Sequence, residues 1–289
     1  MGISRQSVRQ WLGDLLKGGL LALVLGTLAL AAVVWLARVE PHWWWLIAAG
    51  ASVAVELLLT AVAPVLLVPI FLRSRPLAAG ALRDNLLGLA ARAGVSVGSV
   101  RVLQAGAKTA SANAAVMGMG PTRRIVLTDT LIDEAAVDDG SISEVRAVLG
   151  HELGHHRSRD LWRFAALGAV SRFVIFGVAA WLVDRLPQAL AHGGPRTLAG
   201  VPAVGLCLGI AGWPLSLASA AYSRRRERAA DAFGFEVAGD PEAFARALEG
   251  LCRTNLAEHW PPRLVQLRAS HPAPGERIAR ARGSAAPGR

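Results

Sequence analysis

Four long apolar segments constrain the fold of this chain more than any other feature of its sequence. They cover residues 18–37, 43–72, 164–183 and 198–220. Each has about 20 residues or more, the length that a helix needs to cross about 30 Å of hydrocarbon. We therefore expect a mainly α-helical membrane protein with four transmembrane helices. The first segment exceeds the apolar stretch of a signal peptide and a second span follows it, so we expect a retained anchor.

The overall composition supports a membrane protein and argues against other classes. Of the 289 residues, 53% are hydrophobic and only 18% are charged, against about 25% charged in ordinary soluble domains. The net charge is +10, and 29 of the 31 basic residues are arginine, several of them beside the apolar segments. No basic patch with interleaved aromatic residues is present, so we expect no nucleic-acid partner. Cys207 and Cys252 lie in an apolar run and a polar helix, which implies no disulfide framework.

The distribution of basic residues predicts the orientation in the membrane. Basic residues precede the first and third segments and follow the second and fourth, including Arg5, Arg9, Lys17, Arg73, Arg157, Arg163, Arg224 and Arg228. By the positive-inside rule, both termini and the two long polar stretches face the cytoplasm. We expect a multi-pass protein of the inner (cytoplasmic) membrane.

The polar stretches predict a mixed domain that the membrane helices interrupt. We expect an N-terminal region over residues 1–75 with two transmembrane helices, a polar domain over 76–282 interrupted by spans at about 164–183 and 198–220, and a disordered tail over 283–289. Turn residues separate three strand candidates that form a small β-sheet. The predicted strands are 100–104, 114–117 and 124–128, and the predicted helices are 79–93, 142 onward, the fourth span extended to 237, 241–255 and 274–282. Ser141 and Glu144 have the spacing of a capping box.

One short motif carries the chemistry. His151-Glu152-Leu153-Gly154-His155 is an HExxH pattern, and on a helix the two histidines, four residues apart, share a face and can bind one Zn²⁺ ion. Glu152 is then placed to accept a proton from the attacking water. His156 points about 140° away from His151 on the helix, so we expect a polar or interfacial role for it and no metal bond.

A catalytic zinc site needs a third protein ligand, and the candidate is Glu227. Glu227 and Asp231 are four residues apart on one predicted helix and share a face. Glu227 can reach the metal while Asp231 accepts a hydrogen bond from the far nitrogen of a ligand histidine. The alternative is a solvated charged face after a membrane span, with the neighbouring arginines meeting lipid headgroups.

Together these motifs resemble the integral-membrane gluzincin zinc metallopeptidases, the family of the CAAX prenyl proteases and HtpX. The resemblance rests on His151–His155, the Glu227/Asp231 pair and the two apolar spans between them. Further sequence segments support it, namely residues 111–118, 124–131 and Ser270-His271-Pro272 with Arg277. It covers roughly residues 60–280. The four visible spans match HtpX, whereas residues 113 and 128–131 are closer to the prenyl proteases.

The resemblance implies a zincin-like metalloprotease domain on the cytoplasmic side and a role for each residue. His151, His155 and Glu227 would hold one zinc ion per chain, Glu152 would activate the water, and Asp231 would orient a ligand. His271 and Arg277 would stabilise the oxyanion of the tetrahedral intermediate. Substrate backbone would be held by Asn113 and paired as an added strand with Ala114, Ala115, Val116 and Met117. Independently of the family, a lone His-Pro is more often a turn.

We therefore expect a zinc metalloendopeptidase that hydrolyses peptide bonds of membrane-associated proteins or peptides at the cytoplasmic face. Its partners would be the lipid bilayer and a peptide or membrane-protein substrate, and the sequence leaves its oligomeric state open. The alternative is a catalytically silent zinc-binding membrane scaffold. Coordination of the zinc by four protein ligands, with no open position, would favour this alternative. A transporter is the weaker alternative, because four spans without a repeat offer no translocation path.

Two charged residues fall inside the apolar segments. Glu56 and Arg172 both lie near the middle of their spans, where an unpaired charge costs about 2.5–3.5 kcal/mol by insertion scales. We expect them to form an ion pair or to share a hydrated cavity. The alternative is that Arg172 extends toward the headgroups and Glu56 is protonated.

Overall fold

The computed structural model describes residues 4–66, 72–118, 123–132 and 138–283. Its contacts divide the chain into two compact units. The helical unit comprises Val8–Thr60 and Trp162–Ser219, and the mixed unit comprises Met1–Ser7, Ala61–Leu161 and Ala220–Arg289. Each unit is formed by segments that are distant in the sequence.

Four helices are long and apolar enough to cross a membrane, as the sequence predicts. They are α1 (Val8–Val39), α2 (Trp44–Leu66), α6 (Asp160–Val183) and α8 (Val201–Ala238). Within their apolar windows only 11 to 17% of the residues are buried by the protein itself, so the remaining apolar surface requires lipid around it. Residues 67–71 of the predicted second span lie outside the described residues.

The helical unit has its own apolar core and contains the predicted ion pair. Its core consists of small and aromatic side chains: Ala37, Trp44, Ala179, Ala180, Val183, Val204 and Cys207. The guanidinium of Arg172 on α6 contacts the carboxylate of Glu56 on α2, which confirms the expected pairing. The short helix α7 (Gln188–Ala191) and a 3₁₀ turn (Gly194–Arg196) connect α6 to α8.

The mixed unit contains a four-stranded sheet with the order β1-β2-β4-β3. Its strands are β1 (Ser74–Pro76), β2 (Ser99–Leu103), β3 (Ala114–Met117) and β4 (Arg124–Thr128). The pair β2/β4 is parallel, and the pairs β1/β2 and β3/β4 are antiparallel. The bounds of β3 and β4 are those predicted, whereas β1 was not predicted because three residues ending in proline carry no alternation. Strand β3 is an edge strand.

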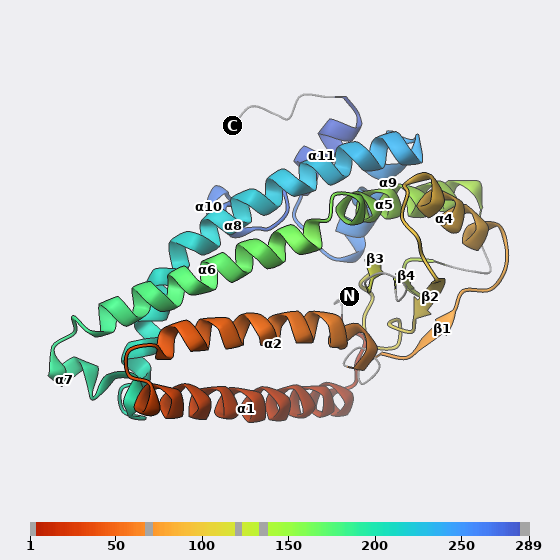
Figure 1. Ribbon diagram of the computed structural model, residues 1–289. Helices are drawn as coiled ribbons and strands as arrows, with labels where there is room; N and C mark the ends of the chain where they lie inside the picture. Colours follow the sequence, from red (N-terminus) through yellow and green to blue (C-terminus); the bar gives the residue numbers. More distant parts are fainter. Residues whose placement is uncertain (1–3, 67–71, 119–122, 133–137, 284–289) are drawn as a thin grey trace. The chain divides into compact units, whose positions relative to one another are not determined.

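Helices accompany the sheet in the mixed unit (Figure 1). They are α4 (Ala81–Arg92), α5 (Asp139–Arg157), α9 (Pro241–Thr254), α10 (Arg263–Arg268) and α11 (Pro274–Ala281). Helix α5 packs against α4, α9 and β3. The fully buried side chains of the core come from α4, α5 and the sheet: Leu86, Leu89, Val102, Ile125, Leu127, Leu149 and Leu153. The buried residues of α5 extend from Ile142 to Gly154, so this part of the helix is held within the unit.

The start of α5 differs from the prediction. The helix begins at Asp139, and its N-cap is Asp138, whose carboxylate accepts a hydrogen bond from the backbone N–H of Ser141 while the Ser141 hydroxyl bonds back to the N–H of Asp138. The predicted capping box of Ser141 and Glu144 was wrong, because the aspartate three residues earlier is the stronger N-cap. Likewise α10 was not predicted, and residues 284–289 of the predicted tail lie outside the described residues.

Candidate metal centre

Helix α5 presents both histidines of the HExxH motif on one face. The Nε2 atoms of His151 and His155 lie 3.4 and 3.2 Å from the two carboxylate oxygens of Glu227 on α8. One ligand atom from each of the three residues falls within 4.8 Å of the others. The structure thus brings together the three predicted ligands, although Glu227 lies 72 residues after His155 in the sequence.

Close packing of α5 against α8 makes this convergence possible. At Gly154, between the two histidines, an added Cβ would lie 3.0 Å from the Cα of Ala230. At Gly234 on α8 an added Cβ would lie 2.8 Å from the backbone nitrogen of His151. Because real Cβ atoms do not approach so closely, the glycines let the two backbones touch and bring the short Glu227 side chain within reach of both imidazoles.

The donor set fits a divalent metal of the zinc type. Two imidazole nitrogens and one carboxylate oxygen are the three protein ligands of many catalytic zinc sites. Glu227 is 5% exposed, and its Oε2 atom is buried without a hydrogen-bond partner among the described residues. An unpartnered carboxylate oxygen costs free energy in a protein interior, and a metal ion at this position would satisfy it.

Each ligand histidine is held by a buried carboxylate on its other nitrogen. Nδ1 of His151 lies 2.8 Å from Asp231, as predicted, and Nδ1 of His155 lies 2.9 Å from Asp160. A carboxylate that accepts the Nδ1–H leaves the Nε2 lone pair available to a metal. Both aspartates are almost fully buried, so the two imidazole rings are fixed in orientation.

Two arginines neutralise these carboxylates. Arg277 on α11 donates to Asp231 at 2.6 and 3.0 Å, and Arg226 on α8 donates to Asp160 at 2.7 Å. Arg277 was predicted to stabilise an oxyanion, and its guanidinium is engaged with Asp231 at the base of the site. A buried carboxylate is stable only when it is paired in this way.

Asp160 was not among the predicted site residues. It follows the end of α5, where Arg159 adopts a left-handed conformation with φ of 55° and turns the chain into α6. This turn brings the Asp160 carboxylate back to His155, which lies in the preceding helix. The only signal in the sequence was an acidic residue five positions after the second histidine, and a continuous helix would have pointed it elsewhere.

The carboxylates around the ligand histidines favour a positive charge at the site. Burial alone would lower the pKa of His155, but hydrogen bonds to Glu227 and Asp160 raise it to about 9. Burial raises the pKa of Glu152 above the usual value, against the opposing effect of His151 and His155. The carboxylates that stabilise a proton on His155 would stabilise a metal cation in the same way, and a carboxyl group with a raised pKa is suited to taking up a proton.

Of the three ligands, His151 lines a cleft of about 660 Å³. His151, Glu152 and His271 line it, and Oε1 of Glu152 lies 3.9 Å from Nε2 of His151. The Nε2 atom of His271 lies 3.5 Å from Glu227, while its Nδ1 lies 2.9 Å from the Ser270 hydroxyl. Burial lowers the pKa of His271. The structure therefore places the predicted base and the predicted oxyanion histidine on one cavity.

Only the first part of the segment predicted to bind substrate lines this cleft. Asn113 and Ala114 are lining residues, and Ala115, Val116 and Met117 are not among the described residues that line it. His156, predicted to be polar and no ligand, donates from Nε2 to the carbonyl oxygen of Val116 at 2.8 Å. This hydrogen bond ties β3 to the helix that carries the ligands.

Asn255, after α9, is a further residue that the sequence did not reveal. Its Oδ1 atom accepts hydrogen bonds from the Ser111 hydroxyl at 2.8 Å and from the backbone N–H of Ala112 at 3.1 Å. Asn255 also lines the cleft. It fixes the residues that lead into β3, and an isolated asparagine 142 positions after Asn113 gave no indication of this.

Comparisons with known proteins agree with this geometry. Residues 76–285 match peptidase family M48, and residues 1–73 match the CAAX prenyl protease N-terminal family, described with five membrane helices. The solved structure of Ste24p from S. mikatae superimposes with a TM-score of 0.82 at 22% identity, covering 97% of this chain and 68% of that chain. At this identity the likeness shows the fold.

Three curated relatives illustrate the range of similar sequences. The uncharacterized metalloprotease YhfN of Bacillus subtilis is 30% identical over 96% of this chain and 66% of its own length. CAAX prenyl protease 1 of Saccharomyces cerevisiae is 28% identical over 61% of this chain and 38% of its own length. The protease HtpX homolog of Aeropyrum pernix is 36% identical over 43% of this chain and 38% of its own length. The chain thus spans between 38 and 66% of the length of these relatives.

Proposed function

The chain belongs to peptidase family M48, and from this membership and the geometry of the site we propose that it is a membrane-embedded zinc metalloendopeptidase. The observation that carries the proposal is the convergence of His151, His155 and Glu227, whose Oε2 atom has no hydrogen bond among the described residues, next to a cleft that His151 and Glu152 line. We assign the peptidase domain to residues 76–282.

The proposed metal is one Zn²⁺ ion held by His151, His155 and Glu227. When bound, it would polarise the scissile carbonyl and lower the pKa of the attacking water. Asp231 and Asp160 would keep the Nε2 atoms of the two histidines directed at the metal. The three-ligand set leaves room for substrate and favours an enzyme over a closed structural site.

Glu152 would act as the general base and then as the general acid. Its carboxylate lines the cleft, and its raised pKa favours uptake of the proton from the attacking water. The same group would then transfer that proton to the leaving amine. His271, with Nε2 turned toward the ligand set, would donate a hydrogen bond to the developing oxyanion. Arg277, engaged with Asp231, would act mainly by positioning His151.

The substrate would be an extended peptide segment that adds to the β3 edge. Asn113 and Ala114 lie on the cleft, and the backbone of an edge strand can pair with an added strand. Membrane-associated proteins or peptides are the proposed substrate class, because the peptidase domain and the four candidate membrane helices belong to one chain.

The chain is a multi-pass membrane protein, and we propose that the site faces the cytoplasm in the inner membrane. The proposal depends on the basic residues at one end of each span. A cysteine introduced at Gly193, between α6 and α8, should react with an impermeant reagent from the outer face only. A cysteine at Ser96 in the mixed unit should react only from the cytoplasmic face. The reverse pattern would place the site outside.

The test of the activity compares the wild-type protein with Glu152→Gln. Both should bind one zinc ion per chain, and only the wild type should hydrolyse peptides, because the ligands remain and the base is lost. Substantial turnover by a folded, zinc-loaded Glu152→Gln protein would contradict the assignment. Full zinc content without hydrolysis of any membrane-associated substrate by the wild type would favour a zinc-binding scaffold.

A further inference from the structure

Helix α10 presents large apolar side chains to its surroundings. Leu264 is 78% exposed, Val265 55% and Leu267 52%. A single exposed leucine is ordinary on a protein surface, but three large apolar side chains within six residues form a patch of the kind that marks an interaction site. Arg263 and Arg268, at the two ends of the helix, are exposed as well.

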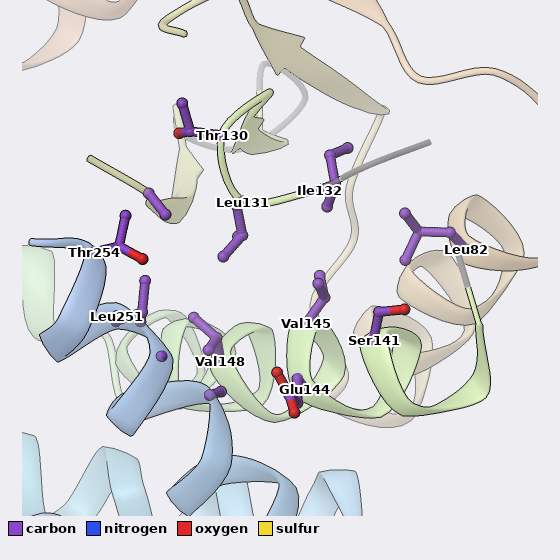
Figure 2. A pocket seen from close by; sticks show the side chains of 13 residues that line it. Leu82, Thr130, Leu131, Ile132, Ser141, Glu144, Val145, Val148, Leu251 and Thr254 are labelled. Carbon is purple, nitrogen blue, oxygen red and sulfur yellow. The ribbon is translucent and has the colours of Figure 1, made fainter. Parts of the chain in front are cut away.

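The cavities of the mixed unit do not account for the two leucines. Val265 lines the cleft, whereas neither Leu264 nor Leu267 is among the described residues that line it. A smaller cavity of about 220 Å³ lies between α4, α5, α9 and the segment after β4, and Figure 2 shows side chains from these elements around it. Its described lining includes no residue of α10. The two leucines therefore require another apolar partner.

The segment that carries this patch is held at both ends. At its C-terminal end, Nη1 of Arg224 on α8 donates to the carbonyl oxygens of Gln266, Leu267 and Ala269 at 3.0, 3.2 and 2.8 Å. These carbonyls belong to the last turn of α10, which has no further helical N–H groups to bond them. Before the helix, the Trp260 indole packs directly over Gly275 of α11, where an added Cβ would clash with the ring. The exposed leucines are therefore presented by an anchored segment.

Arg224, which holds α10, lies close to the end of a membrane span. The apolar segment of α8 ends at residue 220, and Arg224 follows four residues later, about 6 Å along the helix. Arg226 donates to Asp160, the first residue of α6, at 2.7 Å, and the apolar segment of α6 begins at residue 164. Two spans therefore end beside this pair of arginines, and basic residues at span ends lie at the level of the lipid headgroups.

The side chains of α10 have the chemistry of a helix at that level. Helices that lie in the membrane interface bury their apolar side chains about 5–10 Å into the boundary between headgroups and acyl chains. Their basic side chains meet the phosphates of anionic lipids. Leu264 and Leu267 are three residues apart and share a face, and Arg263 and Arg268 flank them. Helix α10 is attached to α8 about one turn beyond an apolar segment that requires lipid around it.

We propose that α10 is an interfacial membrane helix, with Leu264 and Leu267 inserted at the boundary between headgroups and acyl chains. Arg263 and Arg268 contact the phosphates of anionic phospholipids. Val265, on another face of the same short helix, lines the cleft, so contact with lipid fixes one wall of the cleft. The insertion depends on the membrane spans of the chain and does not depend on the peptidase function.

The experiment places a fluorophore on α10 and asks whether lipid quenches it. Leu264→Cys is labelled with the environment-sensitive dye NBD in the full chain and reconstituted into nanodiscs of phosphatidylcholine and phosphatidylglycerol, with or without brominated acyl chains. The native cysteines, Cys207 and Cys252, are buried, and the wild type serves as the labelling control. Emission from the dye should shift to the blue, and brominated lipid should quench it while aqueous iodide should not.

Two sets of variants test the roles of the leucines and the arginines. In the labelled protein, Leu267→Glu should withdraw α10 from the bilayer and reduce quenching by brominated lipid, whereas Leu267→Met, the matched apolar control, should retain it. The double variant Arg263→Gln with Arg268→Gln should lose the dependence of quenching on phosphatidylglycerol. These side chains are exposed, so the melting temperatures should stay equal to that of the labelled parent.

Three results would overturn the proposal. Quenching by iodide without quenching by brominated lipid would show that the patch faces water. Protection from both quenchers would show that a protein surface, such as a second copy of the chain, covers α10. Ser96→Cys, at an exposed polar position in the same unit, is the reference for the dye, and equal quenching by lipid there would show that the dye itself enters the bilayer. Because the measurement is fluorescence, its outcome is independent of whether the wild type cleaves peptides.

Discussion

Nδ1 of His155 lies 2.9 Å from the carboxylate of Asp160, and this pairing repeats at the second ligand what Asp231 does for His151. The two aspartates come from different helices, and each is paired with its own arginine. Because the orientation of both ligand histidines is fixed, the site is preformed, and these side chains need little further ordering when a metal binds.

The first prediction concerns Asp160. Asp160→Ala should lower zinc affinity about 10–100-fold, because the Asp160 carboxylate orients His155 through its Nδ1 and raises the basicity of the imidazole. Competition with a chromogenic chelator measures the affinity. Asp231→Ala should show a loss of similar size. Unchanged affinity in Asp160→Ala would mean that the hydrogen bond to His155 does not contribute to metal binding.

The second prediction concerns the third ligand. Glu227→Ala removes one of three protein ligands and should reduce zinc content severely, by more than Asp160→Ala or Asp231→Ala. Metal analysis of purified protein by atomic absorption measures it. Glu236→Ala, which removes an acidic side chain from the same helix outside the proposed site, serves as the control. Full zinc content in Glu227→Ala would transfer the ligand role to another carboxylate, with Asp231 the nearest.

The residues proposed to carry the chemistry could be predicted from the sequence more completely than the residues that orient them. His151, Glu152 and His155 could be assigned because helical spacing alone puts two imidazoles on one face. Glu227 and Asp231 could be paired for the same reason. Asp160 could not, because its approach to His155 depends on the left-handed turn at Arg159, which no local pattern of polar and apolar residues indicates. Asn255 was missed because its partners are distant in the sequence.

The predictability of the fold varied with the length and periodicity of its elements. The four membrane helices have apolar runs of about 20 residues, the length that indicates a transmembrane helix. Their polar extensions, such as residues 221–238 of α8, carry no such signal, although helix was expected there. β1 and α10 are too short for periodicity to identify them, and they depend on the strands and helices that pack against them.

The third prediction concerns the contact between α5 and α8. Gly234→Ala would place a Cβ 2.8 Å from the backbone nitrogen of His151, so the helices would have to separate. Overpacking of this kind costs about 1–3 kcal/mol, and it would move Glu227 away from the histidines. A lower melting temperature and a lower zinc affinity are expected together. Gly209→Ala, in the same helix with no atom within 4 Å of the added Cβ, should change neither.

The last prediction concerns the ion pair between Glu56 and Arg172 in the helical unit. Both side chains lie near the middle of their spans, and they contact each other across α2 and α6. Glu56→Gln or Arg172→Gln alone would leave one charge without its partner, which costs about 2.5–3.5 kcal/mol at mid-depth by insertion scales. Each single variant should therefore lower the melting temperature and the yield of folded protein.

The double variant Glu56→Gln with Arg172→Gln should recover part of the loss, because both charges are removed and the two amides can bond to each other. A double-mutant cycle on melting temperature in nanodiscs measures the coupling. Effects that simply add, with no recovery in the double variant, would show that the two residues act independently in the membrane.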